Sequence, residues 1–221
     1  MKLAIDDPTV SERAYEVLRA AIVSSRFRPG DALQENGLVS EMGISRTPIR
    51  AALQRLAVEG LVTIAARRGA SVRWLGYDEA RDLHEVRRVI EGESAALAAR
   101  RRSAKVASRL RAVVAGSSTG DGPTPRSLLI NHRFHEGIAD LAGNRRLAEM
   151  IRNTIDLISL WRVEALDQGL RFRGTTEEHG AILDAILDGD EATARALMQA
   201  HIDASWATSS ALTKPKKTFK D

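Results

Sequence analysis

The chain has 221 residues, 43% of them hydrophobic and 28% charged, a balance typical of a globular protein with one large or two modest domains. Its net charge is +4, and because it contains no cysteine, disulfides and thiolate metal sites are excluded. The opening residues MKLAIDDPTV hold two Asp where a secretion signal needs an apolar core, and no apolar run approaches the ~20 residues that span a bilayer, so we expect a cytoplasmic protein.

Residues 10–75 predict a small domain of three helices and a β-hairpin, after an N-terminal arm of residues 1–9. Apolar residues recur at the helical period after Ser11, which we take as the N-cap, and the pair Pro29-Gly30 ends this helix. The second helix ends at Gly43, because glycine readily adopts a left-handed C-cap. The predicted helices span 11–24, 34–42 and 45–60, and the predicted strands span 62–64 and 71–74, around a glycine turn. This order, with the short turn EMGISR, is that of a winged helix-turn-helix.

The third predicted helix has an apolar face and a polar face. Its core side consists of Ile49, Leu53, Leu56 and Gly60, and its polar face carries Thr47, Arg50 and Gln54. Pro48 is tolerated because a missing N–H in the first helical turn leaves no intrahelical bond unmade. We therefore expect the polar face and the N-terminal end of this helix to be available to a ligand.

A recognition helix places such residues in the major groove, where Arg and Gln read base edges while hydroxyls and free amides hold phosphates. Taken singly, each of these residues is more often a solvated surface residue. The order of the helices, the glycine turn and the basic hairpin tip together favour DNA binding. The candidate DNA contacts are Ser45, Arg46, Thr47, Arg50, Gln54, Arg67, Arg68 and Gly69.

The segments RPGDALQE, SEMGISRTPIRAALQRLAVEGLV and RRGASV resemble the DNA-binding domain of the GntR family of bacterial transcription regulators. The resemblance implies that Arg46, Thr47 and Arg50 contact operator DNA and that Gly69 is the glycine of the wing. Asn36 stands where some relatives carry an Arg that touches phosphate, so one expected contact is weakened or moved.

From Asp78 onward the sequence predicts helices only, after a short hinge at 76–77. The predicted helices span 78–101, 103–115, 127–142, 145–167, 175–188 and 190–208, with a loop rich in helix breakers at 117–126. The expected fold is thus mainly α, with the winged helix-turn-helix followed by an all-α antiparallel bundle of residues 78–210. The basic tail of residues 211–221 is expected to be disordered.

All five histidines lie in the second predicted domain. Asn131 and His135 share a helix face at i and i+4, and His179 and His201 lie on two later helices. Side chains from different helices build metal sites inside bundles, and imidazole nitrogen with an oxygen ligand suits Zn, Ni, Fe or Mn. Each histidine by itself is more often a hydrogen-bonded core or surface residue. His132 faces away from His135, and the sequence leaves the role of the fifth histidine open.

The segments DLHEVRRVIEGESAALAA, NHRFHEGIADLAGN and EEHGAILDAILDGDEATARALMQAHI resemble the FCD ligand-binding domain of the FadR-like branch of GntR regulators. The resemblance implies a divalent metal, with Zn the first choice, bound beneath an effector cavity. It also implies that Arg87 faces the effector, although an ordinary exposed Arg fits the sequence equally well, and Glu91 lies one turn on, where it could orient Arg87. The implied metal ligands are Asn131, His135, His179 and His201. An amide oxygen is a weaker donor than the carboxylate of other relatives, so metal affinity is expected to be lower.

The leading interpretation is a homodimeric transcription regulator, not an enzyme, that binds operator DNA and responds to a small carboxylic acid. By resemblance, we expect a repressor that a metabolite releases. One alternative is a metal-dependent enzyme using the histidines, although the chain has no HExxH motif and no carboxylate at obvious general-base spacing. Another is a DNA-binding dimer without an effector. The sequence leaves open the effector, the operator, the sign of regulation and the metal.

Overall fold

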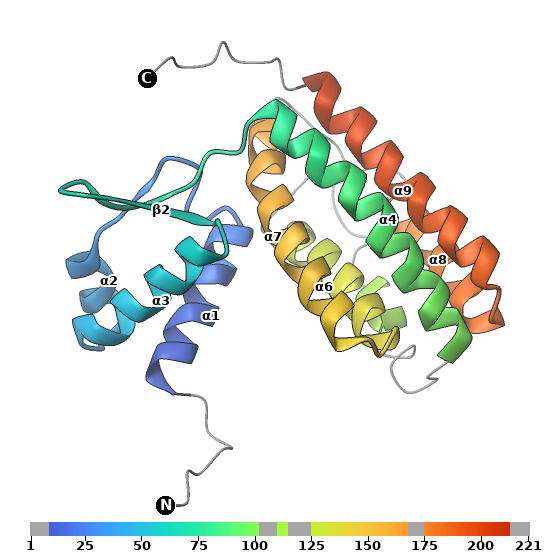
Figure 1. Cartoon of the computed structure of the whole chain (residues 1–221), viewed down its shortest axis with the longest axis horizontal. Coiled ribbons are helices and arrows are strands. Elements are labelled where there is room, and N and C mark those ends of the chain that lie inside the picture. The colour runs from blue at the N-terminus through green and yellow to red at the C-terminus, as the bar shows by residue number, and fades with distance from the viewer. Residues whose placement is uncertain (1–8, 102–109, 115–124, 168–174, 213–221) are drawn as a thin grey trace, which may run out of the picture. The chain divides into compact units, whose positions relative to one another are not determined.

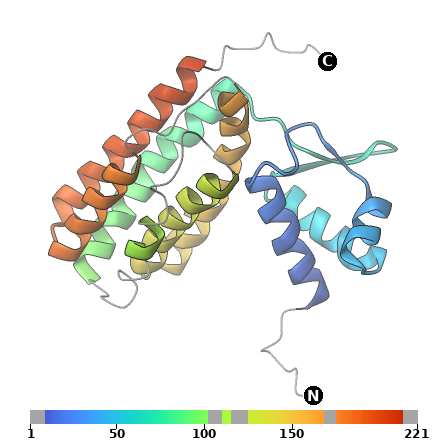
Figure 2. The ribbon, with the colours of Figure 1, turned by 180° about the vertical axis from the view of Figure 1, so that it is seen from behind.

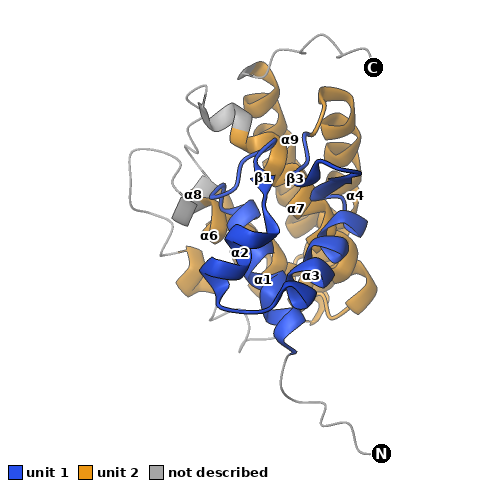
Figure 3. Ribbon diagram, turned by 90° about the vertical axis from the view of Figure 1, so that its left-hand side faces the viewer, with its two compact units in different colours: residues 1–74 blue, residues 75–221 orange. Residues whose placement is uncertain are grey.

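In the computed structural model the chain forms two compact units, Met1–Trp74 and Leu75–Asp221 (Figure 1, Figure 3). The structure describes residues 9–101, 110–114, 125–167 and 175–212. Residues 1–8 of the expected N-terminal arm, most of the predicted helix at 103–115, most of the loop at 117–126 and nearly all of the basic tail lie outside the described residues. No helix in the described ranges is both long and apolar enough to cross a membrane.

The first unit contains three helices and a three-stranded antiparallel sheet (Figure 1). The helices are α1 (Val10–Val23), α2 (Glu35–Met42) and α3 (Arg46–Val58), and the strands are β1 (Ala32–Leu33), β2 (Val62–Ala65) and β3 (Gly69–Val72). β3 lies between β2 and β1 in the sheet. The sequence predicted only the hairpin of β2 and β3, because a strand of two residues is too short to show an alternating pattern.

Helix α1 begins earlier than predicted, and the expectation of Ser11 as N-cap is wrong. The cap is Thr9, whose hydroxyl accepts from the Glu12 amide at 3.2 Å while the Glu12 carboxylate accepts from the Thr9 amide at 2.6 Å. This reciprocal arrangement satisfies two free backbone donors and needs a Glu or Gln three residues after the cap. Thr9 has Glu12 at that spacing, whereas Ser11 has Ala14.

The core of the first unit forms where α1 packs against α3. Ile49 and Leu56 are fully buried, as the predicted face of the third helix requires, and Leu18 and Ile22 of α1 are also buried. Helix α2 ends at Gly43, whose φ of +65° is the left-handed conformation that its position required. The unit therefore holds the polar face of α3 on a fixed support.

The second unit is an all-α bundle. Its helices are α4 (Tyr77–Arg101), α6 (Pro125–Leu141), α7 (Arg145–Asp167), α8 (Thr175–Asp188) and α9 (Glu191–Leu212), and residues 110–114 are also helical. The views from the front and from behind both show α4 along the length of α9 (Figure 1, Figure 2). The core consists mainly of alanines of α4 and larger side chains of the other helices, among them Phe134, Ile138, Ile182, Met198 and Ile202.

Several predicted boundaries of the bundle helices differ from those observed, and three of these differences are informative. Tyr77, expected in a hinge, is the first residue of α4 and contacts the rings of Trp161 and Trp206, with centroids 5.9 and 5.6 Å away. Pro125 opens α6 inside the predicted loop, since proline is tolerated in a first helical turn. Helix α9 continues to Leu212, past the predicted end.

Candidate DNA-binding surface and candidate metal centre

The polar face of α3 is exposed along its N-terminal half. Arg46, Thr47, Arg50 and Gln54 are all exposed, whereas Pro48, Ile49, Ala52, Leu53 and Leu56 are buried on the opposite face. Ser45 is the N-cap but makes no side-chain capping bond, so its hydroxyl and the first-turn amides remain available to an acceptor. No acidic residue lies in the first turn of α3. This helix end is positively polarised and suits a phosphate or another anion.

The three candidate residues of the hairpin tip lie between β2 and β3. Arg67, Arg68 and Gly69 are all exposed, and Gly69 has a φ of +78°. Arg67 also has a positive φ, of 68°, which is uncommon for a residue with a Cβ. The tip therefore presents two cations on a tightly turned backbone.

Arg50 differs from the other candidate cations because it has a carboxylate partner. Its Nε–H donates to Glu35 of α2, with the two carboxylate oxygens 2.9 and 2.8 Å away. Sequence spacing does not predict this pair, because Glu35 and Arg50 lie on different helices.

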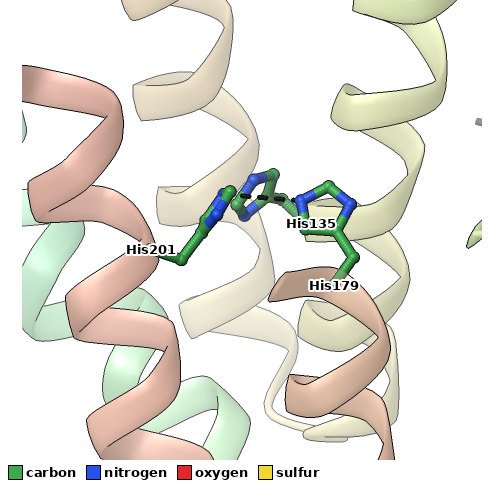
Figure 4. Close-up of side chains that lie close together, drawn as sticks. All are labelled: His135, His179 and His201. Atoms are coloured by element: carbon green, nitrogen blue, oxygen red, sulfur yellow. Dashed lines mark hydrogen bonds between the residues drawn. The ribbon is translucent and has the colours of Figure 1, made fainter. Parts of the chain in front are cut away.

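Three histidines from three helices meet inside the bundle (Figure 4). His135 lies on α6, His179 on α8 and His201 on α9, and all three are buried. One ring nitrogen of each lies within 4.8 Å of one ring nitrogen of the others. The Nε2 atoms of His179 and His201 are 3.4 Å apart. Two nitrogens bound to one Zn at ~2.1 Å in tetrahedral geometry would be roughly 3.4 Å apart.

Two carboxylates contact the outer nitrogens of this histidine cluster. Glu178 Oε2 lies 2.6 Å from His201 Nδ1, and Glu91 Oε2 lies 2.5 Å from His135 Nδ1. The second contact is close but lacks the alignment of a hydrogen bond. A carboxylate on one ring nitrogen fixes the tautomer and directs the other nitrogen inward, which is the usual outer arrangement around a metal-bound histidine. Phe134 stacks on His179, with centroids 3.7 Å apart, and fixes the plane of the third ring.

Burial favours the neutral form of His135 and His179, which is the form that a metal requires. It lowers the pKa of His135 to about 4, although Glu91 raises that pKa. Burial, with the charges of His135 and His201, also lowers the pKa of His179. A neutral imidazole binds a cation without first releasing a proton.

Several polar atoms in and around the cluster are buried without a hydrogen-bond partner among the described residues. They are His135 Nε2, His179 Nδ1, Asn131 Oδ1 and Arg87 Nη2. Buried polar atoms are nearly always satisfied, so each of these atoms is available to a water, an ion or a ligand. Asn131 lies one turn before His135 on α6, and its free oxygen fits the predicted ligand set. The donors present thus fit a divalent cation of the Zn class.

Two buried arginines belong to the same interior. Arg87 Nε donates to Glu91 at 2.5 Å, so the predicted orientation of Arg87 by Glu91 is present, and the guanidinium is buried instead of exposed. Arg162 of α7 is also buried and donates to Ser205 of α9. Burial and the nearby charge of Arg87 lower the pKa of Arg162 to about 9, while Glu91 opposes this shift. Two guanidinium groups in one protein interior favour an anionic ligand.

The remaining two histidines have other surroundings. His132 is buried beside Asp156, with Nε2 2.6 Å from Oδ1, and so lies apart from the cluster as predicted. His84, which the sequence left open, stacks on Trp206, with centroids 5.2 Å apart, and its Nε2 lies 3.3 Å from Asp203. Neither belongs to the candidate metal centre.

Sequence reasoning missed Glu178 and Arg162. Glu178 directly precedes His179 but contacts the histidine of the next helix, so only the packing of α8 on α9 reveals its role. Arg162 gave one signal, since it is a charged residue inside the apolar run ISLWRV of a predicted buried helix. A charge in such a run is either exposed at the helix edge or held in the interior for a purpose.

Comparisons with known proteins cover both units. Residues 10–72 match the family described as bacterial regulatory proteins, gntR family, and residues 82–204 match the FCD domain. The Nta operon transcriptional regulator of Aminobacter aminovorans is 31% identical over 81% of this chain and 85% of its own length. The putative L-lactate dehydrogenase operon regulatory protein of Escherichia coli K12 is 26% identical, over 87% and 83% respectively.

Two solved structures share the fold. The Escherichia coli protein McbR/YncC superposes with a TM-score of 0.84 at 19% identity, covering 93% of this chain and 99% of that one. A putative GntR transcriptional regulator from Rhodococcus sp. RHA1 gives a TM-score of 0.72 at 24% identity, covering 92% and 99%.

Proposed function

Because the chain belongs to the GntR family of bacterial regulatory proteins, carries an FCD domain and is a DNA-binding transcription regulator, we propose that it is a repressor that a small carboxylic acid releases from its operator. The relatives and both families are transcription regulators and not enzymes, so the enzyme alternative falls away. Such a repressor would act in the bacterial cytoplasm, which contains the operator DNA.

The proposed DNA-binding residues are the candidates on α3 and the wing. Arg50 and Gln54 read base edges, Ser45, Arg46 and Thr47 hold phosphates or bases at the polarised end of α3, and the wing tip contacts the adjacent backbone. Exposure of these side chains opposite a fully buried face supports this assignment. A homodimer would present two such helices to two half-sites of a pseudo-palindrome.

The observation that carries the effector proposal is the buried histidine cluster with unsatisfied donors around it. His135, His179, His201 and Asn131 would hold a divalent metal, Zn before Ni, Fe or Mn, and the metal would supply a Lewis-acidic centre for a carboxylate. The free Nη2 of Arg87 would bind the same anion, and Arg162 adds a second positive charge to the interior. An effector acts only if it binds one of two arrangements of the protein more tightly.

Thermal unfolding with and without a chelator tests this proposal. Pure protein is analysed for metal, and its unfolding temperature is measured with a panel of carboxylic acids. A ligand at one hundred times its Kd adds about 2.7 kcal/mol, or on the order of 5–10 °C, to a domain of this size. We expect a shift from at least one acid that chelation removes, and release by that acid of a duplex selected by the protein from a random library.

The outcomes separate the proposal from its alternative. A protein that binds DNA but carries no metal, and whose unfolding temperature no acid changes, is a DNA-binding dimer without an effector. Tight DNA binding only in the presence of the acid would instead make the protein an acid-dependent binder and would contradict release.

A further inference from the structure

The contact between Arg50 and Glu35 joins the recognition helix to the helix before it. Arg50 lies in the second turn of α3 and Glu35 in the first turn of α2. The carboxylate accepts from Nε with both oxygens, at 2.9 and 2.8 Å. Neither Nη group of Arg50 has a partner among the described residues. Glu35 therefore holds the Arg50 guanidinium through Nε–H and leaves both Nη groups available to donate to another acceptor.

The other candidate cations of this surface lack such a partner. The side chains of Arg46, Arg67 and Arg68 make no hydrogen bond or ion pair with any described residue, although all three are exposed on the same unit. A flexible cation without a partner suits phosphate, because a phosphate contact tolerates many geometries. A base edge requires a more precisely placed cation, because guanine O6 and N7 accept two hydrogen bonds from an Arg guanidinium in only one orientation.

From this contrast we propose that Glu35 is a positioning residue that orients the Arg50 guanidinium for reading one base, and so determines sequence preference without adding affinity for unrelated DNA. This inference rests on the proposed contact of Arg50 with a base.

The position of Glu35 is suited to this role. Helix α2 is anchored by the buried Leu38, packs against α3 and ends at the Gly43 cap, so the carboxylate is presented from a fixed element. A guanidinium on a flexible side chain loses rotamer freedom when it binds a base, and a fixed carboxylate removes part of that freedom in advance. The benefit is limited to sequences that offer the correct base to Arg50.

The charge of Glu35 has the opposite effect on affinity. A carboxylate near the phosphate backbone is repelled by every DNA sequence equally. Its removal is therefore expected to strengthen binding to unrelated DNA while weakening discrimination. A residue with a merely structural role would change both affinities in the same direction.

Glu41 provides a matched control. It also lies on α2 and forms an exposed ion pair, with Arg26 at 2.5 Å, but makes no hydrogen bond or ion pair with α3 among the described residues. Glu35→Gln and Glu41→Gln each remove one negative charge and one surface ion pair from the same helix. Their effects on unrelated DNA should be alike, and any difference in discrimination isolates the contact with Arg50.

The experiment uses the full-length protein and two duplexes at one salt concentration. One is selected from a random library by the wild-type protein, and the other has the same composition in scrambled order. We expect Glu35→Gln to lower the ratio of the two affinities roughly 3–10-fold, whereas Glu41→Gln leaves it within about twofold. Repeating the selection with Glu35→Gln should flatten the preference at one base position in each half-site.

Arg50→Ala separates failure of this inference from failure of the proposed DNA contact. Arg50→Ala alone should lower the ratio roughly 5–100-fold, and adding Glu35→Gln to it should change nothing further, because the two residues act as one unit. Equal ratios for Glu35→Gln and Glu41→Gln overturn the role of Glu35. An unchanged ratio for Arg50→Ala overturns the base contact itself.

Discussion

Glu178 gives the sharpest test of the candidate metal centre, because its role depends only on the packing of α8 on α9. The carboxylate lies 2.6 Å from Nδ1 of His201 and leaves Nε2 facing His179 at 3.4 Å. Glu178→Gln keeps an acceptor for the ring N–H but removes the negative charge that makes the ring a stronger ligand. Loss of such an outer partner lowers metal affinity 10–100-fold, or about 1.4–2.7 kcal/mol. Since the Glu178 side chain is 41% exposed, solvent screens its charge and we expect the lower end, roughly tenfold.

Glu177→Gln is the control for this variant. Glu177 is an exposed neighbour in the first turn of α8, so both substitutions remove the same charge from the positive end of the same helix. Metal-free protein would be titrated with Zn against a competing chelator at fixed pH. Glu177→Gln should stay within about twofold of the wild type. If the two variants bind Zn equally well, Glu178 does not support a metal ligand and the interpretation of the cluster fails with it.

Three further outcomes are expected. The double variant His135→Ala with His179→Ala should lose both metal uptake and the response to the effector while binding operator DNA normally, and a normal effector response in a gel-shift assay would exclude the histidines from sensing. Arg162→Gln should weaken binding of the carboxylic acid by roughly 1.5–3 kcal/mol, the worth of a hydrogen bond to a charged group, as calorimetry would measure; equal affinity would exclude Arg162 from binding the acid. Leu56→Ala should destabilise the first unit by about 2–5 kcal/mol because Leu56 is fully buried, and denaturant unfolding that matches the wild type would contradict that packing.

Local pattern was sufficient for most of the secondary structure. The helices at 145–167 and 175–188 have the predicted limits, because their apolar positions recur at the helical period and turn residues flank them. The sequence-based prediction was wrong where a strand was very short or where two residues were equally suitable as a helix cap. Strand β1 has two residues, and its pairing with β3 is a contact between distant parts of the chain. Ser11 and Thr9 are both acceptable caps by residue type, and only the reciprocal bond with Glu12 decides between them.

In the candidate sites, too, local spacing predicted some features, whereas others depend on how the helices pack. The spacing of Asn131 and His135 puts both on one face of α6 by helix geometry alone, and the buried and exposed faces of α3 follow from the same period. The residues alone left the convergence of His135 with two histidines of later helices as one possibility, and the family resemblance implied it. The structure brings these three rings together. Their binding of a metal stays a prediction.

By itself the sequence determined the two-part organisation, the helices and the polar face of α3, because each follows from the spacing of residues close together in the chain. Only the tertiary structure decided which partners those residues have. The pairs Glu35–Arg50 and Glu178–His201 and the burial of Arg162 all depend on how one helix packs on another. A helical period gives the face on which a side chain lies but not its neighbour across the interface, since that neighbour is set by the packing of the whole unit.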